Sequence, residues 1–414
     1  MRSVIVGGGI GGMALALSLH DAGLREMEIH ESAPALRELG VGINVLPHAV
    51  RELTELGLLD DLHATGIPTG ELAYYSRRGQ RIWAEARGLA AGYRWPQFSI
   101  HRGELLGILH RAVVERIGAA HVHTGHHLVR FGQEKDHVWA EFGDQSRDEG
   151  DVLVGCDGIH SAVRGAFHPD EGPPKWNGIT MWRGVTPGKP FLTGRTMIMA
   201  GHFGRRMVVY PISKRHEEGR RALINWVAEL KNASDQPMPL QDWEHTARAD
   251  QVIEPFASFV FEFLDVPAMI RRAQAIYQYP MVDRDPLPTW SFGRVTLLGD
   301  AAHPMFPVGS NGASQAIIDA RVLARELALQ ASVEAAVVSY DAVRRPATAA
   351  IVQANRQVGP ERCMDVVEER APDGFGSLDA VISQAELLEI SRSYKRTAGF
   401  DPDVLNRRPS LSVR

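Results

Sequence analysis

The chain opens with three glycines whose spacing suits the binding of a phosphate group. Gly7, Gly9 and Gly12 form a G-x-G-x-x-G pattern directly after the apolar run 4–6, which is typical of a buried parallel strand. In such a turn the first glycine permits the bend, the second admits a pyrophosphate to the backbone, and the third lets strand and helix pack closely. Residues 14–19 continue with helical periodicity, so a helix N-terminus would offer free N–H groups to the phosphates. The stretch predicts a dinucleotide site.

An acidic residue follows at the position of a ribose contact. A second strand, predicted over residues 27–30, ends at Glu31. A carboxylate at this point of a dinucleotide-binding unit accepts hydrogen bonds from a ribose diol. We therefore favour a ribose contact for Glu31 over a glutamate that merely lies on the surface beside a structural turn.

Two later strand-to-loop junctions combine aspartate with glycine. The strand predicted over 151–155 runs into Asp157-Gly158, for which a tight turn is the simplest interpretation when the pair is considered alone. The strand predicted over 294–298 ends at Gly299-Asp300, and the glycine-containing loop 305–312 leads into a helix. Glycines before a helix form a second place where backbone N–H groups face an anion or a dipole.

The hydrophobic pattern predicts an α/β fold with a second sheet inserted into it. Strands and helices alternate on either side of the region 178–282, as in a doubly wound parallel sheet. Within that region successive strands are separated by turn residues, which predicts an antiparallel sheet. We divide the chain into a discontinuous dinucleotide-binding domain (1–70, 97–177 and 283–345), a substrate-binding sheet domain (71–96 and 178–282) and a C-terminal helical segment (346–414).

Composition argues against several classes of function. A formal net charge of −5 over 414 residues gives no support to binding of nucleic acid or of an anionic membrane. No apolar run reaches transmembrane length, and the first predicted strand begins at residue 3, which leaves no room for a leader peptide. Cys156 and Cys363 form no metal-binding pattern with each other or with histidine. We expect a cytoplasmic protein, a monomer or a homodimer, without a metal site.

The order and spacing of the three junctions resemble those of the single-component FAD-dependent aromatic hydroxylases, the group A flavin monooxygenases. The resemblance covers nearly the whole chain, and it implies a Rossmann-like FAD-binding domain of the glutathione-reductase type, an inserted antiparallel substrate sheet and C-terminal helices. Segments 201–206 and 358–377 depart from the members that hydroxylate phenazine carboxylates, so their substrate is not carried over. The stretches most similar to those members are 40–44, 99–105, 179–186, 279–288, 296–303 and 311–317.

The resemblance implies FAD as cofactor, NADH or NADPH as reductant and O₂ as oxidant. Asp300 would bind the ribityl hydroxyls, Arg102 the pyrophosphate or ribityl chain, and the 309–312 backbone the N1–C2=O edge of the flavin. Asp157-Gly158 would serve both FAD and the nicotinamide. The full implied set is Gly7, Gly9, Gly12, Glu31, Val41, Gly42, Arg102, Asp157, Gly158, Gly299, Asp300, Pro307, Gly309, Ser310, Asn311 and Gly312.

The implied reaction is hydroxylation of a small aromatic or N-heteroaromatic compound that carries a carboxylate or hydroxyl group. Oxygen would be transferred from a C4a-hydroperoxyflavin, with or without loss of a carboxylate. Catalytic roles are expected for Pro307, Gly309, Tyr210 and Arg183, and substrate contacts for Trp182, Arg183, Tyr210, Tyr279, Phe306 and Pro307.

Some of these roles have structural alternatives. Trp182 and Arg183 alternate on one strand, so only one of them can face a pocket. Arg183 could pair with a substrate carboxylate or be an exposed sheet arginine. At least one of Tyr210 and Tyr279 is expected to be core, and His303 is expected to orient its loop rather than act as a base.

Three other functions use some of the same features. A flavoprotein of the same fold could be an amine dehydrogenase, a reductase or a halogenase, although Asp157-Gly158 and the lack of a second G-x-G-x-x-G favour the monooxygenase. A non-enzymatic FAD- or NAD-binding regulator would not require Asp300 and an intact glycine loop. A plain NAD-dependent dehydrogenase would leave the second and third junctions unexplained.

Overall fold

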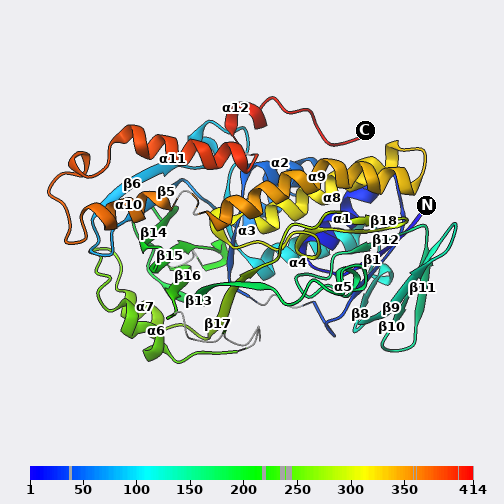
Figure 1. Cartoon of the computed structure of the whole chain (residues 1–414), viewed down its shortest axis with the longest axis horizontal. Helices are drawn as coiled ribbons and strands as arrows, with labels where there is room; N and C mark the ends of the chain where they lie inside the picture. Colours follow the sequence, from blue (N-terminus) through cyan, green and yellow to red (C-terminus); the bar gives the residue numbers. More distant parts are fainter. Residues whose placement is uncertain are drawn as a thin grey trace.

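Two large sheets organise the protein, as the computed structural model shows (Figure 1). The structure describes residues 1–36, 40–216, 221–233, 238, 245–357, 359, 361–399 and 401–413. One sheet has six strands and carries the N-terminal glycine motif, and the other has seven strands and comes mainly from the middle of the chain.

The six-stranded sheet is parallel except at one edge. Its central strand pairs in parallel with the second strand on one side and with the strand before Asp157-Gly158 on the other. All three junctions therefore lie at the carboxyl ends of strands in one sheet, where ligands bind in open α/β folds. In spatial order the strands are β18 (Ser291–Phe292), β19 (Val295–Leu297), β12 (Val152–Gly155), β1 (Arg2–Val6), β2 (Glu26–Glu31) and β8 (Val122–Thr124).

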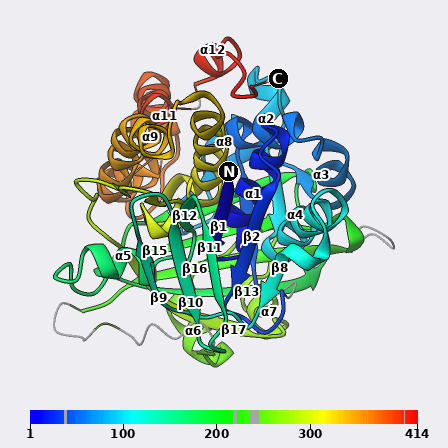
Figure 2. The same ribbon diagram turned by 90° about the vertical axis from the view of Figure 1, so that its right-hand side faces the viewer.

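The helix after the glycine motif, α1 (Ile10–Asp21), is apolar around most of its circumference. Residues 12–19 are all buried. It contacts strands of the sheet and also α8 (Gly312–Leu329) and α4 (Arg102–Arg116), so little of its surface is left for polar side chains (Figure 2). The first and third junctions are thereby packed against each other through their helices.

The seven-stranded sheet confirms the predicted inserted sheet but is not wholly antiparallel. The segment 71–86 forms a hairpin that joins it at one edge, and the first strand of this hairpin, β5 (Glu71–Tyr75), pairs in parallel with β14 (Thr196–His202). β5 and β14 can pair in parallel because a long stretch of chain connects them. The spatial order is β17 (Ile276–Asp283), β13 (Lys175–Gly188), β16 (Ala222–Lys231), β15 (Arg205–Pro211), β14 (Thr196–His202), β5 (Glu71–Tyr75) and β6 (Arg81–Ala86).

The two faces of this sheet are covered by different parts of the chain. One face packs against α6 (Ala249–Phe256) and α7 (Val266–Arg271). The other packs against Phe306 and Val308 of the glycine loop and against α10 (Arg362–Arg370) and α11 (Gln384–Thr397) (Figure 1). Because side chains alternate along a strand, each sheet residue faces only one of these surroundings.

The remaining elements join and flank the sheets. The sequence also predicts a helix over 240–253; the structure has α6 from Ala249 to Phe256, and residues 239–244 lie outside the described residues. Residues 365–373, an acidic stretch of the sequence, lie largely in α10, whose apolar side chains pack on the sheet. The other helices and strands are β3 (Gly42–Val45), α2 (Pro47–Glu55), α3 (Leu59–Thr65), β4 (Ile67–Pro68), β7 (Phe98–His101), β9 (Leu128–Gln133), β10 (Val138–Phe142), β11 (Arg147–Gly150), α5 (Ala162–Phe167), α9 (Val333–Arg356) and α12 (Pro402–Leu405).

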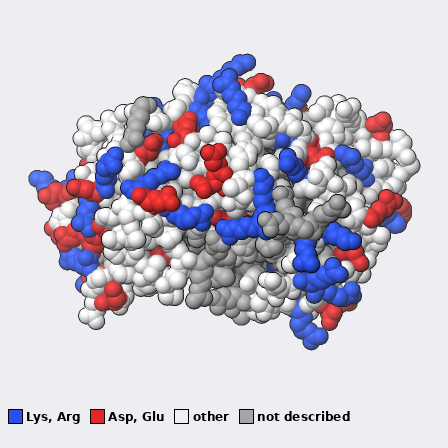
Figure 3. All heavy atoms as spheres, turned by 180° about the vertical axis from the view of Figure 1, so that it is seen from behind, with Lys and Arg blue, Asp and Glu red and all other residues white. Residues whose placement is uncertain are grey.

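Charged side chains of both signs are scattered over the face opposite to that of Figure 1 (Figure 3). Such a mixed surface agrees with the small net charge of −5. Among the helices of the described residues, none combines the length and the apolar character needed to cross a bilayer.

A buried tryptophan provides a test of the seven-stranded sheet. Trp226 is fully buried, donates to Thr186 Oγ1 at 3.1 Å and fills the space above Gly184, where an added Cβ would lie 2.3 Å from its ring. We predict that Trp226→Ala destabilises the fold by about 3–5 kcal/mol, since it leaves a large cavity and removes the hydrogen bond to Thr186 Oγ1. Thermal unfolding checks this, with the exposed Val338→Ala as control, and an unchanged Tm for Trp226→Ala would contradict it.

Candidate active site

The three glycines of the first junction have different surroundings. Gly7 has φ +109°, and a Cβ there would lie 2.4 Å from the Cys156 carbonyl oxygen. A Cβ on Gly12 would lie 2.0 Å from the Gly7 carbonyl oxygen. A Cβ on Gly9 would meet no atom within 4 Å. Two of the glycines are therefore required for packing, whereas Gly9 borders open space, as expected of the glycine that a pyrophosphate approaches.

Glu31 lies against the glycine turn. Its Oε2 accepts a hydrogen bond from the Gly8 N–H at 2.8 Å, and its Oε1 accepts one from the Ala33 N–H at 2.8 Å. An ionised carboxylate has about four acceptor positions, so two backbone donors leave room for ribose hydroxyls. The residue thus has the geometry for the predicted ribose contact and also holds the turn in shape.

The second junction combines a structural role with an unsatisfied atom. Asp157 Oδ2 accepts hydrogen bonds from the N–H groups of Ala162 and Val163 at 2.8 and 3.3 Å, where α5 begins. Asp157 Oδ1 is buried and has no hydrogen-bond partner among the described residues. Burial raises the pKa of this carboxyl group. Gly158 (φ +79°) has no atom within 4 Å of a built Cβ, so a ligand hydroxyl could reach this corner.

At the third junction Asp300 is exposed, yet enough protein surrounds its carboxyl group for burial to raise its pKa. The charges of His303 and Arg102 partly oppose this effect, which places Arg102 within electrostatic range of Asp300. Arg102 is itself exposed, at the start of α4. A carboxylate and a guanidinium that share this region can bind hydroxyls and a pyrophosphate, respectively.

A buried polar network holds the Gly299-Asp300 turn. Asp319 on α8 accepts from the Gly299 N–H at 3.2 Å and contacts His303 Nε2 at 2.5 Å. Arg344 Nε donates to the other carboxylate oxygen of Asp319 at 2.7 Å. Burial alone would raise the pKa of Asp319, but His303 and Arg344 hold it below its usual value. His303 is buried in this network, which agrees with the expected loop-orienting role and not with that of a base.

The backbone of the glycine loop is strained at a non-glycine residue. Gly309 and Ser310 have φ values of +66° and +60°, and the left-handed region is uncommon for serine. Asn44 Nδ2 donates to Ser310 Oγ at 3.3 Å and helps hold this conformation. Pro307 is exposed, whereas Phe306 is buried on the sheet. Since α8 begins at Gly312, its unpaired N–H groups follow this strained turn directly.

Two predicted substrate residues instead anchor the loop at Gly42. Arg183 Nη2 and the Tyr210 hydroxyl both donate to the Gly42 carbonyl oxygen, at 2.8 and 3.0 Å. The Gly42 N–H donates to Asn225 Oδ1 at 2.7 Å. Both polar backbone atoms of Gly42 therefore have partners within the protein, and the Tyr210 hydroxyl donates to backbone. Burial raises the pKa of Tyr210 to about 12, so it remains a donor.

The alternation of Trp182 and Arg183 is resolved by the sheet. Trp182 packs with the cluster that faces α6 and α7, and its Nε1 donates to Gln278 Oε1 at 2.8 Å. The expected substrate contact of Trp182 is therefore wrong, because its ring lies on the far face of the sheet from the glycine loop. Arg183 lies on the near face, together with Tyr279, which is half-buried and feels the charges of Arg183 and Arg102.

Arg164 has a role that the sequence did not reveal. Its Nη1 donates to the carbonyl oxygens of Ala301 and Ala302 at 3.0 and 2.9 Å, and its guanidinium pairs with Glu171. The second and third junctions are thus tied together by a buried cation. Its position in the first turn after Asp157-Gly158 was visible in the sequence, but its distant partners were not.

Comparison with known proteins identifies the family of the chain. A family model described as an FAD binding domain matches residues 1–355. The chain is 47% identical over 360 residues to the phenazine 1,6-dicarboxylic acid hydroxylase of Lysobacter antibioticus, which covers 85% of this chain and 88% of the relative. It is 33% identical over 356 residues to 3-hydroxybenzoate 6-hydroxylase 1 of Aquipseudomonas alcaligenes, with 84% and 86% covered. The chain belongs to the FAD-dependent aromatic monooxygenases.

Solved structures confirm the fold of this monooxygenase. Klebsiella pneumoniae HpxO in complex with FAD and uric acid superposes with a TM-score of 0.75 at 23% identity and covers 98% of this chain and 96% of its own. A salicylate hydroxylase in complex with substrate gives a TM-score of 0.74 at 23% identity, with 100% and 98% covered. The predicted α/β class with its inserted sheet is confirmed.

The residues of this monooxygenase fit FAD. Gly9 leaves a backbone position open for the pyrophosphate, and Asp157 Oδ1 is a buried acceptor that lacks a donor among the described residues. Asp300 is exposed next to the N-terminus of α8. These three observations match the three parts of the predicted cofactor site.

The contrast between Gly9 and Gly12 gives a first test of the site. We predict that Gly9→Ala folds normally but retains little FAD, because the new methyl group points into the space that a pyrophosphate needs. Gly12→Ala should lower both FAD content and Tm, since its Cβ would overlap the Gly7 carbonyl. Flavin absorbance and thermal unfolding of the two purified variants check this. A Gly9→Ala protein with full flavin would contradict the assignment.

Asp300 gives a second test. Asp300→Ala is expected to weaken FAD binding by at least about tenfold, the loss typical of a charged hydrogen-bond acceptor. The fold should remain intact because the Asp300 side chain is exposed. Flavin content after gel filtration measures the effect, with Asp61→Ala as a control for loss of an exposed aspartate. Full occupancy in Asp300→Ala would refute the role.

Proposed function

We propose that this FAD-dependent aromatic monooxygenase hydroxylates a planar N-heteroaromatic compound that carries a carboxylate, with O₂ and NADH or NADPH. The observation that carries the proposal is the meeting of three strand-to-loop junctions beside the inserted sheet, in a chain that is 47% identical to a phenazine 1,6-dicarboxylic acid hydroxylase. The 3-hydroxybenzoate relative also acts on an aromatic acid, as its name states.

Bound FAD supplies the redox chemistry of hydroxylation, namely acceptance of a hydride and activation of O₂. The residues of the chain hold the reactants and exclude water. The N–H groups and dipole at the start of α8 would stabilise negative charge on the cofactor. The sheet face that bears Met181 and Tyr210 covers the glycine loop with apolar and hydrogen-bonded side chains, which limits water near the reacting atoms.

Tyr279 and Arg183 are the proposed groups on the sheet side of the substrate. Burial raises the pKa of Tyr279, so its hydroxyl stays protonated at neutral pH and can donate a hydrogen bond. Arg183 has one nitrogen bound to Gly42 and a buried Nε without a hydrogen-bond partner in the described part of the chain. Pro307 and Gly309 would lie on the cofactor side.

The proposal also includes a cytoplasmic location, where a nicotinamide reductant is available, and a monomer or homodimer. The division into a discontinuous FAD-binding domain, a sheet domain and a C-terminal helical segment is proposed with the boundaries given above. Loss of a substrate carboxylate during hydroxylation is an open alternative within the same reaction class.

Turnover with parallel product analysis tests the function. Purified holoenzyme is mixed with NADH or NADPH and with N-heteroaromatic acids, benzoic acids and phenols, while nicotinamide oxidation, H₂O₂ and hydroxylated product are measured together. We expect an N-heteroaromatic acid to accelerate oxidation and to yield product with little peroxide. A compound that accelerates nicotinamide oxidation but yields only H₂O₂ would bind at the site without being positioned for hydroxylation. Reduction of the flavin by amines, without formation of a hydroxylated aromatic product, would contradict the proposed hydroxylation.

A further inference from the structure

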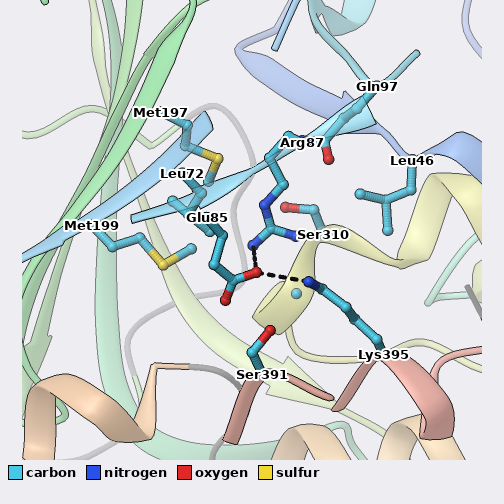
Figure 4. A pocket seen from close by; sticks show the side chains of 11 residues that line it. Leu46, Leu72, Glu85, Arg87, Gln97, Met197, Met199, Ser310, Ser391 and Lys395 are labelled. Atoms are coloured by element: carbon cyan, nitrogen blue, oxygen red, sulfur yellow. Dashed lines mark hydrogen bonds and ion pairs between the residues drawn. The ribbon is translucent and has the colours of Figure 1, made fainter. Parts of the chain in front are cut away.

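A small cavity lies beside the glycine loop, on the side where the sheet meets the C-terminal helix. Gly309 and Ser310 form part of its wall, and α11 closes it from the opposite side (Figure 4). The family model ends at residue 355, so the α11 part of the wall lies beyond the matched region. The lining residues are Leu46, Leu72, Glu85, Arg87, Gln97, Met197, Met199, Gly309, Ser310, Ser391 and Lys395.

Three charged side chains converge in this cavity. Lys395 Nζ of α11 lies 2.8 Å from Glu85 Oε2, and Arg87 Nη2 lies 3.7 Å from the same oxygen (Figure 4). Burial alone would raise the pKa of Glu85, but Arg87, Lys395 and a hydrogen bond from Ser391 hold it below its usual value. Two cations and one ionised carboxylate leave a net charge of +1 in the lining.

One buried donor in this cavity is unsatisfied. The Arg87 side chain is only 10% exposed, and its Nε has no hydrogen-bond partner among the described residues. A buried donor without an acceptor costs free energy. A ligand that brings an anionic group to this cavity would supply that acceptor.

The rest of the wall is apolar. Leu46, Leu72, Met197 and Met199 supply aliphatic and thioether groups. Ser310 brings the strained glycine loop to the same cavity. The cavity has a volume of about 30 Å³, so it admits the carboxylate group of an acid, and the ring that carries this group would lie outside the cavity.

We propose that Arg87 and Lys395, which share Glu85 as their only counter-ion among the described lining residues, form the carboxylate-binding subsite for the aromatic acid substrate. This inference rests on the proposed function and adds the residues that recognise the acid. It also assigns a role to α11: the helix carries a cation into the site. Arg183, the expected carboxylate partner, already donates through Nη2 to the Gly42 carbonyl oxygen.

Direct binding to the holoenzyme tests the subsite. The change in flavin absorbance is titrated with phenazine-1,6-dicarboxylic acid, with 3-hydroxybenzoic acid and with the uncharged amides of both. Lys395→Met is expected to raise the Kd of the acids by about tenfold or more and to leave the Kd of the amides unchanged, because only the acids lose a charged partner. Lys395→Arg should retain acid binding.

Glu85→Gln gives a prediction of opposite sign. Removal of the internal carboxylate raises the net charge of the lining from +1 to +2, so acids should bind several-fold more tightly. Arg396→Met is the matched control, since this neighbour on α11 is exposed and should leave every Kd unchanged. Lys395 is 20% exposed on a surface helix, so its variants are expected to fold even if substitutions of buried Arg87 do not.

The outcomes separate the subsite from the proposed function. Equal effects of Lys395→Met on acids and amides, or no effect on either, would overturn the subsite. No binding of any acid to the wild-type holoenzyme would also overturn it, while hydroxylation of an uncharged aromatic compound would leave the hydroxylase in place. Charge-dependent acid binding without hydroxylation of any acid would support the subsite and overturn the proposed function.

Discussion

A single buried carboxylate determines whether the third junction keeps its shape. Asp319 has no exposed surface, yet it stays ionised because His303, Arg344 and the Gly299 N–H all bind it. A buried carboxylate of this kind is tolerated only when its lone pairs are filled by well-placed donors. The network reaches from α8 and α9 to the turn that presents Asp300, so the cofactor site and the helical layer depend on one another.

On the substrate side the seven-stranded sheet fixes the positions of site residues. It does so because side chains alternate between its two faces, and not through buried charges. Each strand sends one set of side chains to α6 and α7 and the other set to the glycine loop and the C-terminal helices. Arg183 and Tyr210 belong to the second set and converge on one carbonyl oxygen of the loop at Gly42. Two distant segments are thereby held at a fixed separation, which is what a site for oxygen transfer requires.

The charged cavity extends this arrangement to the end of the chain. Glu85 comes from the edge hairpin and Lys395 from α11, and they meet beside Ser310 of the glycine loop. The hairpin, the loop and α11 each supply part of the wall. In the proposed subsite, recognition of an acid would thus depend on α11, whereas the residues expected to bind the cofactor lie within residues 1–312.

The sequence by itself determined the local parts of this protein. Glycine spacing, Glu31 after its strand, Asp157-Gly158 and Gly299-Asp300 predicted the junctions, because backbone conformation and the chemistry of a strand end depend on neighbouring residues. The alternation of predicted strands and turn residues likewise predicted the inserted sheet, because strands and turns also depend on neighbouring residues. Only the tertiary structure decided which face each sheet residue occupies, and so placed Trp182 away from the glycine loop. It also brought Arg87, Glu85 and Lys395 together, since contacts across some 310 residues follow from packing and leave no local signature.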